Sequence, residues 1–225
     1  MIQRLGGEEA RKTLGELCEI YWPPLYGFAR SQHWSVEDSE DLTQGFFVHL
    51  LETELLAKAD RQRGSLRSFL LGAFKLFIAD QRRAATRLKR GGGQPLLPLD
   101  AGALELIERE LADAPQSAEA EFDRRWYSSL LECAMADLEQ EYFQRGQGER
   151  FQRLVPFLAW NRKDSDLAGA ASGLGMSHGA LRVAIVRMRQ RLREWIEHHV
   201  SQTVEDASQA AGELANMRLV LGSSV

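Results

Sequence analysis

The stretch that constrains the fold most is residues 166–193, which read DLAGAASGLGMSHGALRVAIVRMRQRLR. A short helix of small residues over 167–174 meets a turn at Gly175, and Ser177 then stands where a helix N-cap belongs. The apolar residues that follow recur at helical spacing, namely Leu181, Ile185, Met188 and Leu192. The pattern predicts a helix-turn-helix whose second helix is anchored by this apolar stripe.

The second helix of this pair is strongly basic. No acid occurs in it before Glu194, and its arginines are Arg182, Arg187, Arg189, Arg191 and Arg193. A helix with this charge has the size and sign to enter the major groove of DNA. A solvated amphipathic helix would give the same short pattern, so that alternative stays open.

Charge is segregated along the rest of the chain, although the net charge is only −4. Residues 32–60 contain seven acids and one lysine. Residues 61–90 contain nine lysines or arginines and one aspartate, and residues 100–123 contain eight acids and one arginine. Blocks of opposite sign indicate different partners for different surfaces.

Helical periodicity extends over most of the chain, and no strand pattern is evident. An amphipathic segment over 14–31 should break or kink at Pro23-Pro24. The next helix should begin near Ser35 or Asp38, and Ser65 should cap a long helix after it. Beyond a triple glycine at 91–93 the periodicity is weak, apart from a short helix expected over 104–111.

Helicity returns near Glu119, and a further helix is expected over 150–160. We therefore expect an all-α protein of two small helical domains joined by a flexible acidic linker, with the helix-turn-helix in the C-terminal domain. The expected boundaries are 1–90 for the first domain, 91–118 for the linker, 119–200 for the second domain and 201–225 for a C-terminal tail. Apolar residues in the tail predict a short amphipathic helix that packs back on the preceding domain or covers its DNA face, namely Leu214, Met217, Leu219, Val220 and Leu221.

Several function classes find no support in the residues. No apolar run is long enough for a membrane span, and Glu8 and Glu9 occupy the place of a signal-peptide core, so we expect a cytoplasmic protein without a membrane partner. Cys18 and Cys133 form no metal-binding pair and are expected to be small buried residues. The five histidines form no zinc motif, and the triple glycine lacks the rest of a phosphate loop. We expect no enzyme activity, catalytic residue, metal or cofactor.

A second nucleic-acid signal lies at the end of the first basic block. Phe69, Phe74 and Phe77 accompany cations on one helix, a combination that single-stranded DNA binding can use through stacking and phosphate contacts. At helical spacing these aromatic residues are more typical of core packing, so the charge is the stronger part of the signal.

The segment DSEDLTQGFFVHLL, residues 38–51, resembles the DxEDLxQxxFxxLL helix of bacterial RNA polymerase sigma factors of the extracytoplasmic-function group. In that family this helix binds the polymerase core. The resemblance implies a core polymerase-binding face of Asp38, Glu40, Asp41, Leu42, Gln44 and Phe47. Gly45 stands where the family often has an acid, and phosphorylation of Ser39 or Thr43 would supply negative charge there.

Two further segments match the same family in the same order, so the resemblance covers roughly residues 18–200. Residues 63–84 resemble the helix that captures the unwound −10 element, which implies −10 DNA binding by Lys75, Asp80, Arg82, Arg83 and Arg87. Residues 173–194 resemble the helix that reads the −35 element. The implied −35 DNA-binding residues are Ser177, His178, Ala180, Arg182, Arg187, Arg189 and Arg191.

The resemblance implies a sigma factor that binds the polymerase core, recognises both promoter elements and helps to melt the promoter. The partners would be bacterial RNA polymerase core and promoter DNA, with an anti-sigma factor or a Ser/Thr kinase as candidate regulators. A linker of that length could reach on the order of 80 Å when extended, enough to bridge two promoter elements. Two alternatives stay open: a stand-alone helix-turn-helix transcriptional regulator, which would normally bind as a dimer, and a protein-only adaptor.

Overall fold

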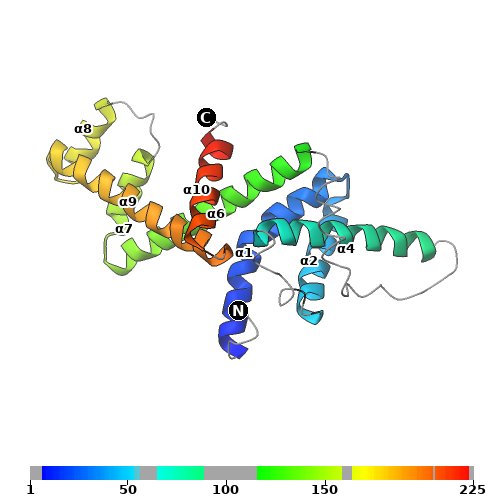
Figure 1. The fold of residues 1–225 in the computed structure, drawn as a ribbon. Coiled ribbons are helices and arrows are strands. Elements are labelled where there is room, and N and C mark those ends of the chain that lie inside the picture. The colour runs from blue at the N-terminus through cyan, green and yellow to red at the C-terminus, as the bar shows by residue number, and fades with distance from the viewer. Residues whose placement is uncertain are drawn as a thin grey trace. The chain divides into compact units, whose positions relative to one another are not determined.

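The computed structural model describes residues 7–53, 55, 65–88, 116–158, 164–204 and 206–222. In this part of the chain all regular elements are helices, as Figure 1 shows, which confirms the all-α prediction for it. The expected linker lies outside the described residues apart from its last three, and so does the short helix expected over 104–111.

The chain divides into two compact units. The first comprises Met1–Ser129 with Ser201–Val225, and the second comprises Leu130–Val200. Helices α6 (Gln116–Gln144) and α9 (His178–Thr203) each begin in one unit and end in the other. The compact units therefore divide the chain after residues 129 and 200, whereas the sequence pattern placed a boundary at residue 119.

Helix α1 (Gly7–Ser31) runs without interruption through Pro23 and Pro24. The helix is therefore not broken at these prolines, while the expectation of a kink stays a prediction. Each proline removes a backbone donor, but neighbouring apolar side chains on both sides are buried in the core. Tyr21 is 1% exposed and Leu25 is fully buried, so tertiary packing keeps the segment helical.

Helices α2 (Val36–Glu52) and α4 (Leu66–Leu88) begin where the sequence predicted. The Ser35 hydroxyl accepts a hydrogen bond from the Asp38 amide at 3.0 Å. In the same way, the Ser65 hydroxyl accepts one from the Ser68 amide at 3.3 Å. Each serine satisfies an amide of the first turn that has no partner within the helix.

Aromatic side chains join α1, α2 and α4 into the core of the first unit. The ring of Phe74 in α4 lies 5.0 Å from that of Phe46 in α2 and 6.3 Å from that of Phe28 in α1. Phe77 lies one turn further along α4, 5.7 Å from Phe46. The interpretation of these phenylalanines as core residues is thus confirmed for Phe74 and Phe77, both of which are buried.

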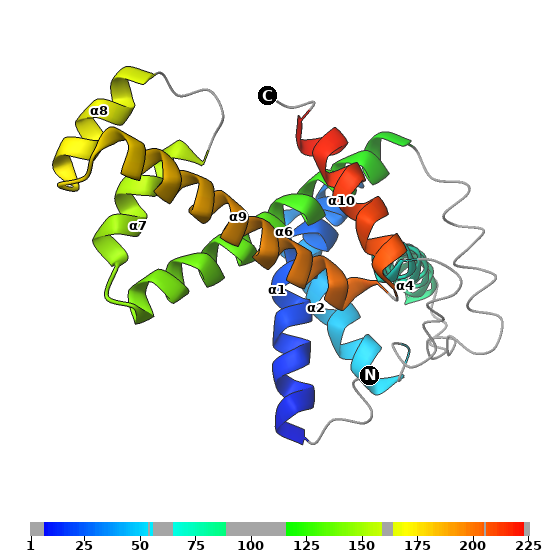
Figure 2. The same ribbon diagram turned by 60° about the vertical axis from the view of Figure 1, so that its left-hand side comes forward.

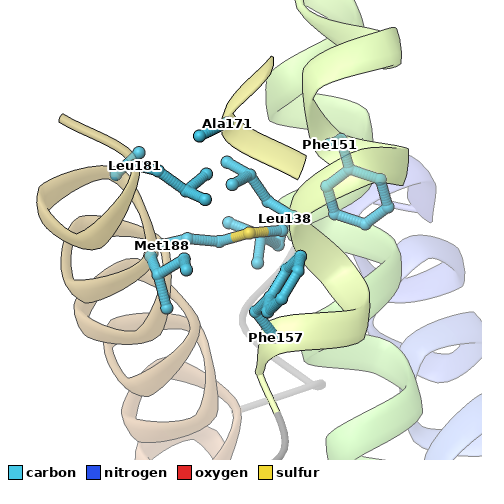
Figure 3. Close-up of a cluster of buried hydrophobic side chains, with 9 residues drawn as sticks. Leu138, Phe151, Phe157, Ala171, Leu181 and Met188 are labelled. Atoms are coloured by element: carbon cyan, nitrogen blue, oxygen red, sulfur yellow. The ribbon is translucent and has the colours of Figure 1, made fainter. Parts of the chain in front are cut away.

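In the second unit, the second half of α6 packs with three shorter helical segments and with α9. The segments are α7 (Gly148–Leu154), the 3-10 helix η3 (Val155–Phe157) and α8 (Asp164–Gly173). Figure 3 shows the buried cluster that they share, with Met188 and Leu181 of α9 facing Leu138 of α6. The helix expected over 150–160 is shorter, because the α-helix ends before Pro156 and changes to 3-10 geometry.

The tail forms helix α10 (Ala207–Gly222), which confirms the expected helix. Its packing partner differs from the expectation. Glu213 of α10 bonds to Tyr127 in the first half of α6 and to Arg67 in α4, both in the first unit, where Figure 2 shows α10 beside these helices. Met217 is buried, but Leu219 is 71% exposed, so the apolar residues do not all face inward.

Candidate functional site

The connection between α8 and α9 is a tight turn with a positive backbone angle at Gly175, where φ is +62°. Two backbone amides after the last turn of α8 donate hydrogen bonds to its carbonyl oxygens. The Leu174 amide bonds to the Ala170 oxygen at 3.1 Å, and the Met176 amide bonds to the Ala171 oxygen at 2.9 Å. Glycine adopts this left-handed conformation with little strain, which explains its place in the turn.

Ser177 caps α9, as its position in the sequence predicted. Its hydroxyl accepts a hydrogen bond from the Ala180 amide at 3.2 Å. His178 and Ala180 in the first turn are exposed, and both belong to the proposed set of base-contacting residues. The serine oxygen is therefore engaged in the cap, while the side chains beside it face solvent.

Beyond the first turn, one side of α9 is exposed and basic. We call it the α9 face and define it as Arg182, Val183, Val186, Arg187 and Gln190. The opposite side of the helix carries Leu181, Ile185 and Met188, all buried in the second unit. The exposed fractions of Val183 and Val186 are 49% and 63%. These two valines were not among the residues predicted from the sequence, although their positions beside the buried stripe indicate that they are exposed.

The later arginines of α9 are fixed within the protein. Arg189 donates a hydrogen bond to the Phe157 carbonyl oxygen at 2.7 Å. Arg191 bonds to Glu141 at 2.7 Å and to Glu194 at 2.6 Å, and its guanidinium lies over the Trp195 ring. Of the arginines expected to contact DNA, these two have structural roles, whereas Arg182 and Arg187 are exposed.

Glu141 of α6 binds two side chains of α9, Arg191 and Trp195. Its Oε2 accepts hydrogen bonds from Arg191 and from the Trp195 indole nitrogen, at 2.7 and 3.0 Å. Burial alone would raise the pKa of Glu141, but these donors and the nearby Arg145 outweigh it and lower the pKa. The carboxylate thus stays charged and holds Arg191 in place.

A groove of about 810 Å³ lies in the second unit between the end of α6, α7 and α9. Four arginines and two glutamates line it, namely Arg145, Arg150, Arg187, Arg191, Glu141 and Glu194. The balance of charge is positive, and Arg187 belongs both to the groove and to the α9 face. An anionic group next to the α9 face would meet favourable charge there.

Helix α2 divides the predicted polymerase-binding residues into two groups. Leu42 and Phe47 are buried, and the Phe47 ring stacks on Trp22 of α1 at 5.8 Å. The other four are exposed, namely Asp38, Glu40, Asp41 and Gln44. Asp38 also accepts a hydrogen bond from the Ser35 hydroxyl at 2.7 Å, so it has a role at the start of the helix.

The exposed side of α2 extends further than the sequence predicted. We call it the α2 stripe and define it as Glu37, Asp41, Gln44, Val48 and Leu51. Their spacing of three and four residues places them on one side of the helix. Val48 and Leu51 are 46% and 49% exposed, so a surface that begins with acids ends with apolar side chains.

The two hydroxyls considered for phosphorylation are both fully buried. Ser39 donates to the Ser35 carbonyl oxygen, and Thr43 donates to the Ser39 carbonyl oxygen, each at 2.7 Å. A kinase could reach either side chain only if α2 separated from its neighbours, so the packing of α2 does not favour this modification.

The predicted −10 residues are in three different situations along α4. Lys75 is only 8% exposed and pairs with Glu119 of α6 at 2.6 Å. Asp80 accepts a hydrogen bond from Arg83 at 2.5 Å, and Arg83 is exposed. Arg82 is also exposed, with its guanidinium over the Trp34 ring. Arg87 belongs to α4, but its side chain lies outside the described residues.

Within the described ranges, no helix combines the length and apolar character needed to cross a membrane. The same ranges contain no group of three or more histidine, cysteine, aspartate or glutamate side chains that could hold a metal ion. No protein-family model matches the chain, and comparison with curated proteins and with solved structures gives no match.

Proposed function

We propose that the protein is a transcription initiation factor of the sigma type, which binds a bacterial RNA polymerase core and recognises promoter DNA. The observation that carries the proposal is the α9 face, an exposed and basic side of a helix that follows a short helix and a glycine turn. In this interpretation α8 and α9 form a helix-turn-helix, and α9 lies in the major groove of the −35 element.

The chemistry of the α9 face supports base recognition. Arginine donates two hydrogen bonds to the acceptors of guanine, and small apolar side chains contact the thymine methyl group. Arg182 supplies the first kind of contact, and Val183 and Val186 supply the second, while Arg187 beside the groove contacts phosphate. His178 in the first turn adds a side chain that can donate or accept a hydrogen bond.

The surroundings of the α9 face support phosphate contacts. The groove beside Arg187 contains Arg145 and Arg150, whose charge attracts the sugar-phosphate backbone. Arg189 and Arg191 act indirectly in this proposal, because their bonds to Phe157 and Glu141 fix the packing of α9.

The α2 stripe supports a protein partner in place of nucleic acid. Glu37 and Asp41 would repel phosphates, whereas Val48 and Leu51 lose exposed apolar surface when a protein covers them. A partner with basic and apolar side chains fits this stripe, and the resemblance assigns that partner to the polymerase core. Arg82 and Arg83 at the far end of α4 then contact the unwound −10 strand.

Run-off transcription with purified bacterial core polymerase on a genomic promoter library tests the proposal. We expect promoter-specific transcripts with the wild type and their loss with the double variant Glu40→Lys and Asp41→Lys. The matched control is Glu132→Lys with Glu139→Lys, because these exposed acids of α6 lie in the second unit and the change in net charge is the same. The control should support transcription like the wild type.

The alternative function gives a different result in the same experiment. A stand-alone regulator would produce no promoter-specific transcript with any of these proteins, and the free protein would bind a specific duplex tightly, as a dimer. Absence of both transcription and duplex binding would contradict the assignment of the α9 face to DNA.

A further inference from the structure

Cationic side chains in the first half of α4 are covered by carboxylates from distant parts of the chain. The Lys75 ammonium lies 2.6 Å from Oε1 of Glu119 in α6. The Arg67 guanidinium pairs with Asp123 of α6 and, at 3.2 Å, with Glu213 of α10. The exposed fractions of the Lys75 and Arg67 side chains are only 8% and 12%. These five residues all belong to the first unit.

Two of the ion pairs connect α4 with the first half of α6. Moving along α4 from Arg67 to Lys75, the partner on α6 moves back from Asp123 to Glu119. On the inner side of the same stretch of α6, Trp126 is fully buried. The Arg67 guanidinium also lies 5.1 Å from the centre of the Trp126 ring, so the contact between α4 and α6 includes a core side chain as well as the charges.

Glu213 is held more tightly than a surface carboxylate. It is 7% exposed, and its Oε2 accepts a hydrogen bond from the Tyr127 hydroxyl at 2.7 Å. Burial alone would lower the pKa of Arg67, but Asp123 and Glu213 outweigh burial and raise it. The cation therefore stays charged and depends on these carboxylates for compensation.

Two cations in the second half of α4, Arg82 and Arg83, are exposed to solvent. Arg83 pairs with Asp80 of the same helix, and Arg82 is exposed beside Trp34. Arg82 and Arg83 thus face solvent, whereas the charges of Arg67 and Lys75 are neutralised by carboxylates of α6 and α10.

We propose that Glu119, Asp123 and Glu213 form an acidic cover that occupies Lys75 and Arg67 in place of nucleic-acid phosphates. The free protein is then in a closed state, and the first half of α4 binds single-stranded DNA only when the cover is displaced. The inference rests on the proposed function in so far as that function assigns α4 to promoter DNA.

Two physical features make such a cover effective. The carboxylates belong to the same chain as the cations, so their local concentration is far above that of any free competitor. Carboxylate and phosphate oxygens also bind the same ammonium and guanidinium donors. DNA, with many adjacent charges, or a partner that moves α6 and α10 would be needed to displace the cover.

Binding of a fluorescent single-stranded DNA oligonucleotide to the full chain, followed by anisotropy, tests the cover. The variant is Glu119→Gln with Glu213→Gln, which keeps the size of both side chains and removes their charge. We expect its Kd to be about tenfold lower than that of the wild type, because Lys75 loses the charge of its partner Glu119 and Arg67 keeps only one of its two carboxylate partners, Asp123.

The matched control is Glu121→Gln with Glu197→Gln, which changes the net charge equally. Glu121 pairs with Arg124 and Arg125 inside α6, and Glu197 is an exposed acid of α9. The control should bind within about twofold of the wild type, apart from the general effect of charge. An equal gain in affinity for both double variants would overturn the cover.

Hydrogen exchange of the wild type gives a second readout that requires no substitution. On saturation with the oligonucleotide, amides in α10 and in the first half of α6 should exchange faster, since these segments leave α4. Unchanged protection of both segments in the DNA-bound protein would contradict the proposal, even where the double variant is unstable.

The outcomes separate the cover from the proposed function. Tighter oligonucleotide binding by the double variant, without any transcription in the run-off assay, would support the cover and reject the initiation factor. Promoter-specific transcription by the wild type, with oligonucleotide binding equal in all three proteins, would support the initiation factor and reject the cover.

Discussion

The Tyr127 hydroxyl in α6 donates a hydrogen bond to the Glu213 carboxylate in α10, with an oxygen-oxygen distance of 2.7 Å. Both side chains are buried, and burial followed by this hydrogen bond raises the pKa of Tyr127. Since Glu213 also pairs with Arg67, one carboxylate connects the C-terminal helix to two other helices of the first unit.

Replacing Glu213 by alanine should lower the free energy of unfolding by about 2–4 kcal/mol, because Arg67 and Tyr127 would lose a charged partner in a buried position. Urea denaturation followed by circular dichroism measures the change. Glu197→Ala removes an exposed acid and should change stability by less than about 0.5 kcal/mol. Equal stability of the two variants would show that the contact contributes nothing.

Leu181 and Val183 lie two positions apart in α9 but differ in burial. Leu181 is fully buried in the cluster of Figure 3, so Leu181→Ala should destabilise the protein by about 2–5 kcal/mol through a cavity. Val183 is 49% exposed, and Val183→Ala should cost less than about 0.5 kcal/mol. Thermal unfolding of both variants tests the orientation of α9, and a reversed order would contradict it.

Two glycines near the start of α9 should respond oppositely to alanine. Gly175 has φ of +62°, where an alanine is strained, so Gly175→Ala should destabilise by about 1 kcal/mol. Gly179 lies inside α9 with open space around it, so Gly179→Ala should stabilise by about 0.5–1 kcal/mol. Denaturant titrations measure the free energy of unfolding of both variants. Stabilisation by both substitutions would contradict the positive φ at Gly175.

Burial lowers the pKa of His49, although the carboxylates of Glu52 and Asp80 oppose the shift. The folded state therefore binds a proton less readily than the unfolded chain. This contribution to stability is fully present above the unfolded pKa of about 6.5 and is lost as the pH falls below it. Between about pH 7.5 and 5.5, the free energy of unfolding should fall less for His49→Gln than for the wild type. If the free energy of unfolding depended on pH equally in both proteins, His49 would not contribute to the pH dependence of stability.

Arg187 and Arg191 should affect DNA binding and stability differently. Arg187→Ala should weaken binding to a −35 duplex and reduce the slope of log K against log salt by about 1, as for a lost phosphate contact. Arg191→Ala should mainly lower the unfolding temperature, because Glu141 loses a hydrogen-bond donor. Binding titrations at several salt concentrations, with melting curves, separate the two effects; equal salt slopes would refute the distinction.

The sequence predicted the elements that depend on near neighbours. Ser35, Ser65 and Ser177 each cap the helix predicted after them, since a cap requires only a side chain and an amide three positions further on. The apolar periodicity of α9 likewise predicted the burial of Leu181, Ile185 and Met188, whereas Leu192, the fourth residue of the predicted stripe, is only partly buried. For the candidate site, the same periodicity separated Arg182 and Arg187 from the core of the second unit.

Tertiary structure decided what depends on partners far along the chain. Lys75 and Glu119 are 44 positions apart, and Tyr127 and Glu213 are 86 apart, so no local pattern could reveal that these charges and hydroxyls pair. Packing of Tyr21 and Leu25 likewise keeps α1 helical through Pro23-Pro24, against the local preference. The sequence by itself determined helix type and exposed charge through short-range interactions, whereas burial and pairing across helices determined which of those charges a ligand can reach.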